Sequence, residues 1–163
     1  MKVMLKDGSS MEFENGVSVL EVAKTISEGL ARVACAAKVN GEVVDIRTEL
    51  TDDCEVEILT FRDDEGKRAF RHTASHIMAQ AVKRLYPDAK LAIGPSIDDG
   101  FYYDFDRESA FTQEELADIE KEMKKIVKEN IKLEKFELPR EEAVKFMEEK
   151  EEPYKVELIQ DLP

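Results

Sequence analysis

The hydrophobic pattern of the chain changes its period near residue 62, and this change constrains the fold more than any other feature. Up to that point apolar residues alternate with polar ones, which is the pattern of strands with one buried face. From Phe70 to Leu85 apolar residues recur at steps of three and four, which is the pattern of an amphipathic helix. The charged segment 62–66 separates the two patterns and is the expected linker. The sequence therefore predicts two cores, one in residues 1–62 and one in residues 63–163.

Residues 1–62 are predicted to form a small α+β unit. Turn signals at Asp7-Gly8 and Asn40-Gly41 lie between alternating stretches and indicate two hairpins. Ser18 is a good N-cap with Glu21 as its capping-box partner, and the helix that it opens is expected to stop near Gly29. The expected order is strand, strand, helix, strand, short strand, strand, which is the β-grasp order. Nothing in this unit has the pattern of a catalytic site.

The only two histidines of the chain, His72 and His76, are four positions apart on the predicted helix. This spacing puts both imidazoles on one face, one turn above the other. Two interpretations stay open: a pair of surface or half-buried histidines, or a site in which both rings face a cleft. Two residues alone make a weak metal site, because zinc normally takes three or four protein ligands.

The segment after the histidine helix is predicted to turn back as a strand. Pro87 ends the helix, and Asp99-Gly100 turns the chain into a strand over Phe101–Phe105. Alternation places Tyr103 on the same face as the two phenylalanines. Aromatic core packing and a contact to a substrate both remain open for this tyrosine.

The last third of the chain is predicted to begin with a long helix. Thr112 and Glu115 form a capping box that opens this helix. Its buried stripe is expected to contain Leu116, Ile119, Met123, Ile126 and Val127. A strand over residues 131–138 and a short helix from Pro139 to Met147 are expected to follow.

The formal net charge of −13 argues against broad electrostatic binding of nucleic acid. A nucleic-acid contact would need a local basic patch. Four lysines of the long helix could supply one, although such a row is more often a solvated face: Lys121, Lys124, Lys125 and Lys128. The chain has no run of about 18 apolar residues, so no membrane span is predicted. It also has no glycine-rich phosphate loop, so ATP binding by this chain is not predicted. We expect a cytoplasmic protein without a membrane partner.

Four sequence blocks together resemble the N-terminal region of the bacterial threonyl-tRNA synthetase family. These blocks are HTASH at 72–76, LYPDAKLAIGP at 85–95, DGFYYD at 99–104 and EPYKV at 152–156. The resemblance covers essentially the whole chain and implies an α+β fold. Residues 1–62 would be a ubiquitin-like TGS domain, and residues 63–163 would be a second α+β domain of the threonyl/alanyl editing type, truncated at its C-terminal side. In the family, that second domain hydrolyses threonine tRNA wrongly charged with serine.

The resemblance assigns roles to four residues. His72, His76 and Lys155 would be catalytic, and Tyr103 would bind substrate. No metal ligand is assigned, and the two histidines would hold a metal only if zinc occupied the site. Both imidazoles are expected to face an open cleft floored by the strand that carries Tyr103. The chain has the HxxxH half of the family's site but no CxxxH segment after it, so we expect the fragment alone to be inactive.

No cofactor is expected for the fragment itself. For the parent enzyme the resemblance implies a threonine–tRNA ligase that uses ATP and Mg²⁺, with zinc in its synthetic core. The implied partners are the acceptor end of tRNA(Thr), the remaining synthetase domains and, through those domains, a second copy in a homodimer. The alternative is a non-catalytic module that either binds the tRNA acceptor end or has a regulatory role. A free-standing alanyl-type editing protein is disfavoured, because a TGS-like unit precedes the HxxxH motif and no CxxxH follows.

Overall fold

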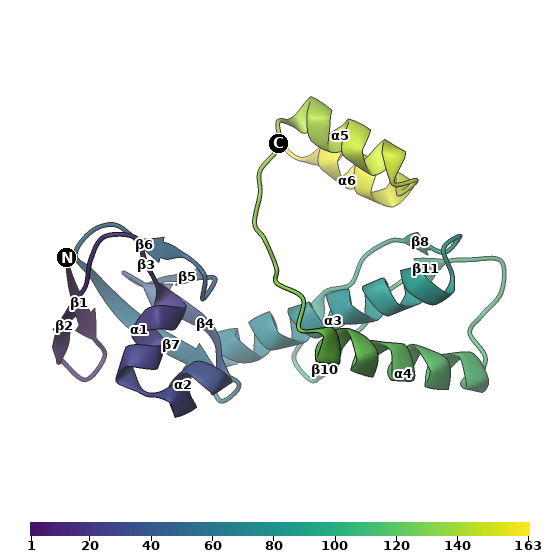
Figure 1. The fold of residues 1–163 in the computed structure, drawn as a ribbon. Helices are drawn as coiled ribbons and strands as arrows, with labels where there is room; N and C mark the ends of the chain where they lie inside the picture. The colour runs from purple at the N-terminus through teal and green to yellow at the C-terminus, as the bar shows by residue number, and fades with distance from the viewer. The chain divides into compact units, whose positions relative to one another are not determined.

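The computed structural model describes all of residues 1–163. It is a mixed α+β structure that divides into two compact units, Met1–Arg71 and His72–Pro163. Each unit has its own hydrophobic cluster. The two units are described separately below, with the labels of Figure 1.

The first unit is built on a five-stranded sheet with the order β2-β1-β7-β4-β5 (Figure 1). Its strands are β1 (Lys2–Leu5), β2 (Ser10–Glu12), β4 (Ala34–Val39), β5 (Glu42–Val44) and β7 (Cys54–Thr60). The neighbouring strands β1 and β7 are parallel, and the other neighbours are antiparallel. The short strands β3 (Val17–Ser18) and β6 (Glu49–Leu50) form a separate pair. This arrangement confirms the predicted β-grasp fold.

Two helices follow β3 where the sequence predicted one. The helix α1 (Val19–Ile26) begins with the predicted capping box between Ser18 and Glu21. It ends at Ser27, whose hydroxyl then accepts a hydrogen bond from the Leu30 N–H and caps α2 (Glu28–Val33). The predicted stop near Gly29 is therefore wrong, because a serine cap starts a second helix before that glycine is reached. Val19 and Val22 of α1 pack on the sheet in a core with Val3, Ala37, Leu50 and Val56.

The helix α3 (Asp64–Leu85) begins inside the segment predicted to be a linker. Asp63 ends β7 tightly, since its carboxylate accepts hydrogen bonds from the N–H and the hydroxyl of Thr60. These bonds hold the pKa of Asp63 below its usual value. Lys38 of β4 also pairs with Glu65 at 2.7 Å. The first turn of α3 is thus bonded to the first unit, and the domain boundary after residue 62 stays a prediction.

The second unit combines the rest of α3 with a distorted hairpin and three more helices. The hairpin runs through β8 (Lys90–Leu91), β9 (Ser96–Ile97), β10 (Gly100–Phe101) and β11 (Phe105–Asp106). The helices are α4 (Gln113–Glu129), α5 (Arg140–Glu149) and α6 (Pro153–Asp161). The core of this unit lies between α3 and α4 and contains Ala81, Val82, Ala89, Ile119 and Ile126.

Several predictions for the second unit need correction. The expected strand over Phe101–Phe105 is broken into β10 and β11, since the pairing shifts its register between them: Phe101 pairs with Ser96, whereas Phe105 pairs with Leu91. The expected strand at 131–138 has no regular secondary structure and pairs with no other strand. On α4 the capping box of Thr112 and Glu115 is confirmed. Its stripe is only partly buried, since Leu116 and Val127 are exposed.

We predict that Gly66→Ala destabilises the first unit. A Cβ at this position would lie 2.0 Å from the carbonyl oxygen of Thr60, a backbone atom that cannot move aside cheaply. Overpacking of this kind costs about 1–3 kcal/mol of unfolding free energy. The measurement is urea unfolding of the whole chain, followed by NMR signals of the Val3 and Val56 methyl groups.

The matched control for this experiment is Gly29→Ala. This glycine also lies in a helix, but a Cβ there would meet only the Ser27 hydroxyl at 3.9 Å. Alanine is the better helix former by about 1 kcal/mol, so this variant should be neutral or more stable. Equal effects of the two substitutions would contradict the close packing of α3 on β7.

Candidate functional site

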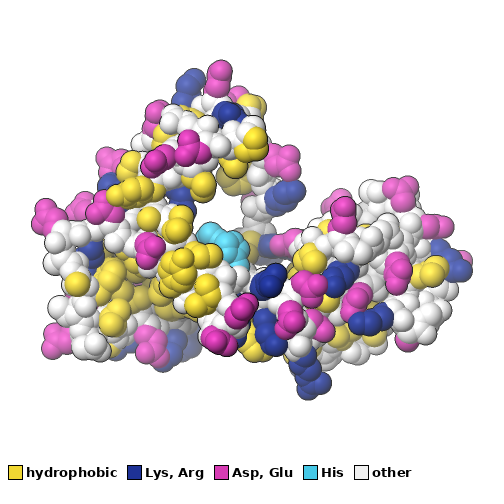
Figure 2. Space-filling model, turned by 180° about the vertical axis from the view of Figure 1, so that it is seen from behind, with side chains coloured by type: hydrophobic (Ala, Val, Ile, Leu, Met, Phe, Trp, Pro, Cys, Tyr) yellow, Lys and Arg dark blue, Asp and Glu magenta, His cyan; other side chains and the backbone are white.

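The two histidines form a directly bonded pair on the surface of α3. Their Nε2 atoms are 3.0 Å apart, and the ring planes are nearly perpendicular at 88°. Both side chains are exposed, as the cyan patch in Figure 2 shows. Neither ring is sealed in the core, so both remain available to a substrate. Whether they face a cleft floored by the Tyr103 segment stays a prediction.

The electrostatics of the pair favour a neutral imidazole at His76. The largest effect on the pKa of His76 is the loss of water around part of the ring, which lowers it. The nearby His72 and Lys155 lower the pKa further. A single proton between two facing Nε2 atoms makes one ring the donor and the other the acceptor. Near neutral pH, His76 can therefore accept a hydrogen bond or a proton.

Lys155 reaches this region from α6, the last helix of the chain. Its ammonium donates a 2.8 Å hydrogen bond to the carbonyl oxygen of Ala92, directly after β8. It also lies 5.6 Å from the centre of the Tyr103 ring. The ammonium is near enough to His76 to affect the pKa of that imidazole. One positive charge thus lies close to the Tyr103 ring and acts on the His76 imidazole.

Tyr103 occupies space that a missing side chain leaves open. A Cβ at Gly94 would lie 2.0 Å from the Tyr103 ring, so only glycine allows the ring its position. The carbonyl oxygen of Gly94 accepts a 2.9 Å hydrogen bond from the hydroxyl of Ser75 on α3. The Tyr103 ring also stacks on Phe105 at 4.9 Å. The ring therefore packs on Phe105, as one interpretation expected, and the contact of Tyr103 to a substrate stays a prediction.

The four residues proposed from the sequence form two contacting pairs, His72 with His76 and Lys155 with Tyr103, and Lys155 also acts electrostatically on His76. His72 and His76 lie on α3, Tyr103 lies between β10 and β11, and Lys155 lies on α6. Three further residues support these elements through hydrogen bonds, an ion pair or close packing, and sequence reasoning missed them. The residues concerned are Ser75, Gly94 and Glu152. A serine on the buried face of a helix was the one available signal, because a buried hydroxyl needs a partner.

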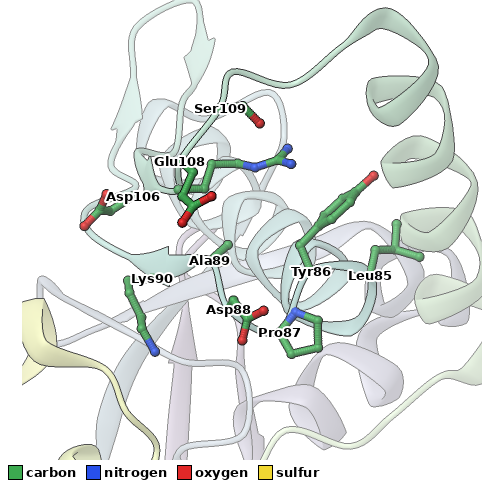
Figure 3. Close-up of a pocket in the computed structure, with 10 residues that line it drawn as sticks. Leu85, Tyr86, Pro87, Asp88, Ala89, Lys90, Asp106, Glu108 and Ser109 are labelled. Atoms are coloured by element: carbon green, nitrogen blue, oxygen red, sulfur yellow. The ribbon is translucent and has the colours of Figure 1, made fainter.

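A separate pocket of about 720 Å³ lies between the end of α3 and the segment after β11 (Figure 3). It is lined by Leu85, Tyr86, Pro87, Asp88, Ala89, Lys90, Asp106, Arg107, Glu108 and Ser109. The guanidinium of Arg107 lies against the rings of both Tyr86 and Phe111, and it pairs with Glu115 at 3.0 Å. None of the four proposed site residues lines this pocket.

The side chains present do not make a complete zinc site. Zinc takes three or four protein ligands, whereas His72 and His76 supply two. No group of three potential ligands is brought together. We therefore assign no metal-dependent step to these residues.

Comparison with known proteins shows what the first 60 residues and the whole chain are similar to. Residues 1–60 match the TGS domain family. Over all 163 residues the chain is 64% identical to a threonine–tRNA ligase of Acetivibrio thermocellus, 63% identical to one of Clostridium acetobutylicum and 59% identical to one of Caldanaerobacter subterraneus subsp. tengcongensis. It spans about a quarter of the length of these curated relatives.

These similarities confirm what the sequence blocks indicated. Residues 1–60 are similar to TGS domains, and the chain as a whole is similar to the N-terminal region of bacterial threonyl-tRNA synthetases. None of its helices is long and apolar enough to cross a membrane.

We predict that Gly94→Ala displaces the ring of Tyr103. The new methyl group would occupy the position of the ring edge, and Tyr103 would lose its placement beside Lys155. The measurement is the NMR chemical shift of the Tyr103 ring, compared with Gly100→Ala, where a Cβ meets nothing within 4 Å. An unmoved Tyr103 signal in Gly94→Ala would contradict the close approach.

We also predict that Lys155→Met raises the pKa of His76. Removing the ammonium removes a repulsion that disfavours the imidazolium. Because the pKa of folded His76 is lowered, the unfolded chain binds more protons, and stability falls as the pH drops through the ordinary histidine range near 6.5. That fall should be smaller in Lys155→Met. NMR titration of the two imidazoles measures the first effect, and urea unfolding at several pH values measures the second.

Proposed function

We propose that this chain is the N-terminal part of a threonyl-tRNA synthetase and that its second unit contributes to the hydrolysis of seryl-tRNA(Thr). The observation that carries the proposal is the convergence of four side chains. Two imidazoles, one ammonium and one phenol come from three separate elements of the second unit. The similarity to threonine–tRNA ligases over the whole chain supports the same substrate class.

The proposed chemistry is the attack of water on an aminoacyl ester. The neutral imidazole of His76 accepts a hydrogen bond from the attacking water, and His72 holds that imidazole by the bond between the Nε2 atoms. Negative charge then develops on the carbonyl oxygen of the ester. The Lys155 ammonium offsets this charge or that of the tRNA backbone nearby. His76 takes one proton from the water as it attacks, and the tetrahedral intermediate then collapses with loss of the tRNA 3′ oxygen, which receives that proton from the His76 imidazolium.

A second, hydrolytic site is useful because a pocket that binds threonine cannot strongly exclude the smaller serine. Serine is smaller than threonine by one methyl group, and a pocket rejects a smaller substrate by only about 1–3 kcal/mol for each missing methylene. A hydrolytic site that admits serine therefore adds selectivity that binding alone does not supply. In this proposal Tyr103 contributes to the wall that receives the aminoacyl group.

The remaining expectations for the whole protein are part of the same proposal. The full-length enzyme ligates threonine to tRNA with ATP and Mg²⁺ and holds zinc in its synthetic core. It works as a cytoplasmic homodimer through domains outside this chain. The second candidate function is a non-catalytic module for the tRNA acceptor end. The net charge of −13 weighs against it as a strong independent tRNA binder.

We predict that the 163-residue chain barely deacylates seryl-tRNA(Thr), while a longer chain that includes the downstream CxxxH segment does so efficiently. A misplacement of reacting groups by about 1 Å can cost roughly a hundredfold in rate, and an incomplete site places them poorly. In the longer chain, His72→Ala, His76→Ala and Lys155→Ala should each lower the rate by about a hundredfold or more. The measurement is deacylation of pre-charged tRNA.

Lys24→Ala is the matched control, since this lysine is exposed on α1 of the first unit and has no part in the proposed site. Its rate should equal that of the unaltered protein. Full activity of the short chain, or full activity of both histidine variants in the longer chain, would contradict the proposed site. Binding of tRNA without any hydrolysis by the longer chain would favour the non-catalytic module.

A further inference from the structure

A buried ion pair joins the two helices that carry the proposed catalytic groups. The Glu152 carboxylate lies 2.8 Å from the Lys83 ammonium, and only 6% of the Glu152 side chain is exposed. Lys83 belongs to the last turn of α3, and Glu152 directly precedes α6. This pair is distinct from the many ion pairs on the surface of the chain, because its carboxylate is shielded from water.

The Glu152 carboxylate has all its bonds outside its own helix. An acidic residue at an N-cap usually accepts hydrogen bonds from the first N–H groups of its helix. Glu152 makes no such capping bond. One of its oxygens pairs with Lys83, and the other accepts a 2.9 Å hydrogen bond from the Leu91 N–H of β8. The carboxylate therefore attaches the start of α6 to both α3 and β8.

Lys83 is equally committed to this junction. Its ammonium donates to the carbonyl oxygens of Pro87 at 2.7 Å and Ala89 at 3.0 Å, in addition to its pair with Glu152. These three acceptors use all three N–H bonds of the ammonium. The end of α3, the turn after it and the start of α6 thus share one cation.

The next residues of α6 continue the attachment. The Tyr154 hydroxyl donates to the Asp106 carboxylate of β11 at 2.8 Å, and Lys155 donates to the Ala92 carbonyl oxygen. Glu152 and Tyr154 are both one or a few residues from Lys155, so whatever fixes them also fixes the ammonium. Of the two, only Glu152 reaches α3, the helix of the histidine pair.

We propose that Lys83 and Glu152 are positioning residues that hold α6, and with it the Lys155 ammonium, beside the imidazoles of His72 and His76. Their meaning for catalysis rests on the proposed function, whereas their effect on the placement of Lys155 does not. Neither residue touches the reacting atoms. Without the pair, α6 would lose its bond to α3, and the distance from Lys155 to the imidazoles would no longer be fixed.

The test is the pKa of His76, measured by NMR titration of the whole chain. The charged or titratable groups that act on this imidazole are His72 on its own helix and Lys155 on α6. Glu152→Gln and Lys83→Met should each raise the pKa of His76, in the same direction as Lys155→Met, since the ammonium and part of the burial are lost. In a Lys155→Met background, Glu152→Gln should raise the pKa by less than it does alone.

Glu151→Gln is the matched control. Glu151 is the neighbouring residue, its side chain is 82% exposed, and it pairs with Lys90 at the longer distance of 3.6 Å. This substitution should leave the pKa of His76 unchanged. An unchanged pKa in folded Glu152→Gln, or an equal shift in Glu151→Gln, would overturn the proposal.

The double variant Lys83→Met/Glu152→Gln guards against simple unfolding, because it removes both charges of the pair together and leaves neither without its partner. It should fold and show the raised pKa of His76. Unfolding of the second unit in both the single and the double variants would also overturn the proposal, since the pair would then support the whole unit rather than the placement of α6. The titrations use no tRNA, so a failure of deacylation would count against the proposed function alone.

Discussion

Two backbone carbonyl groups hold the candidate site together. The carbonyl oxygen of Gly94 accepts its hydrogen bond from Ser75 of α3, and that of Ala92 accepts from Lys155 of α6. Buried carbonyl groups need donors, and in a regular hairpin the opposite strand would supply them. Here the pairing is irregular and the Asp104 N–H donates to the carbonyl oxygen of Ile93, so side chains of two helices serve the carbonyl groups of Ala92 and Gly94 instead. The irregular hairpin is therefore what allows α3 and α6 to meet at one place.

Local sequence signals predicted much of the fold. Both capping boxes and the first hairpin follow from residues close together in the chain. The segment 131–138 shows the limit of such signals. It alternates like a strand, yet it has no partner strand, and alternation alone does not form a strand.

The sequence predicted which chemical groups form the candidate site, but it did not predict the contacts that hold those groups in place. The spacing of His72 and His76 places their rings together on any helix, so their contact follows from sequence. The Glu152 carboxylate finds its partners Lys83 and Leu91 more than sixty positions earlier in the chain. No local pattern indicates such a pairing. Resemblance to a family assigns roles to the reacting groups, while these contacts emerge only from the folded chain.

The contact between Gly94 and Tyr103 means that substitutions at these two positions of the hairpin depend on each other. The ring fills the volume that any other residue at position 94 would claim with its first carbon atom. Loss of the glycine alone would expel the ring, and a smaller residue at position 103 alone would leave a cavity. Related proteins should accordingly keep both residues or exchange both. A lineage that exchanged them would have rebuilt the wall of this site and, with it, the range of aminoacyl groups that fit there.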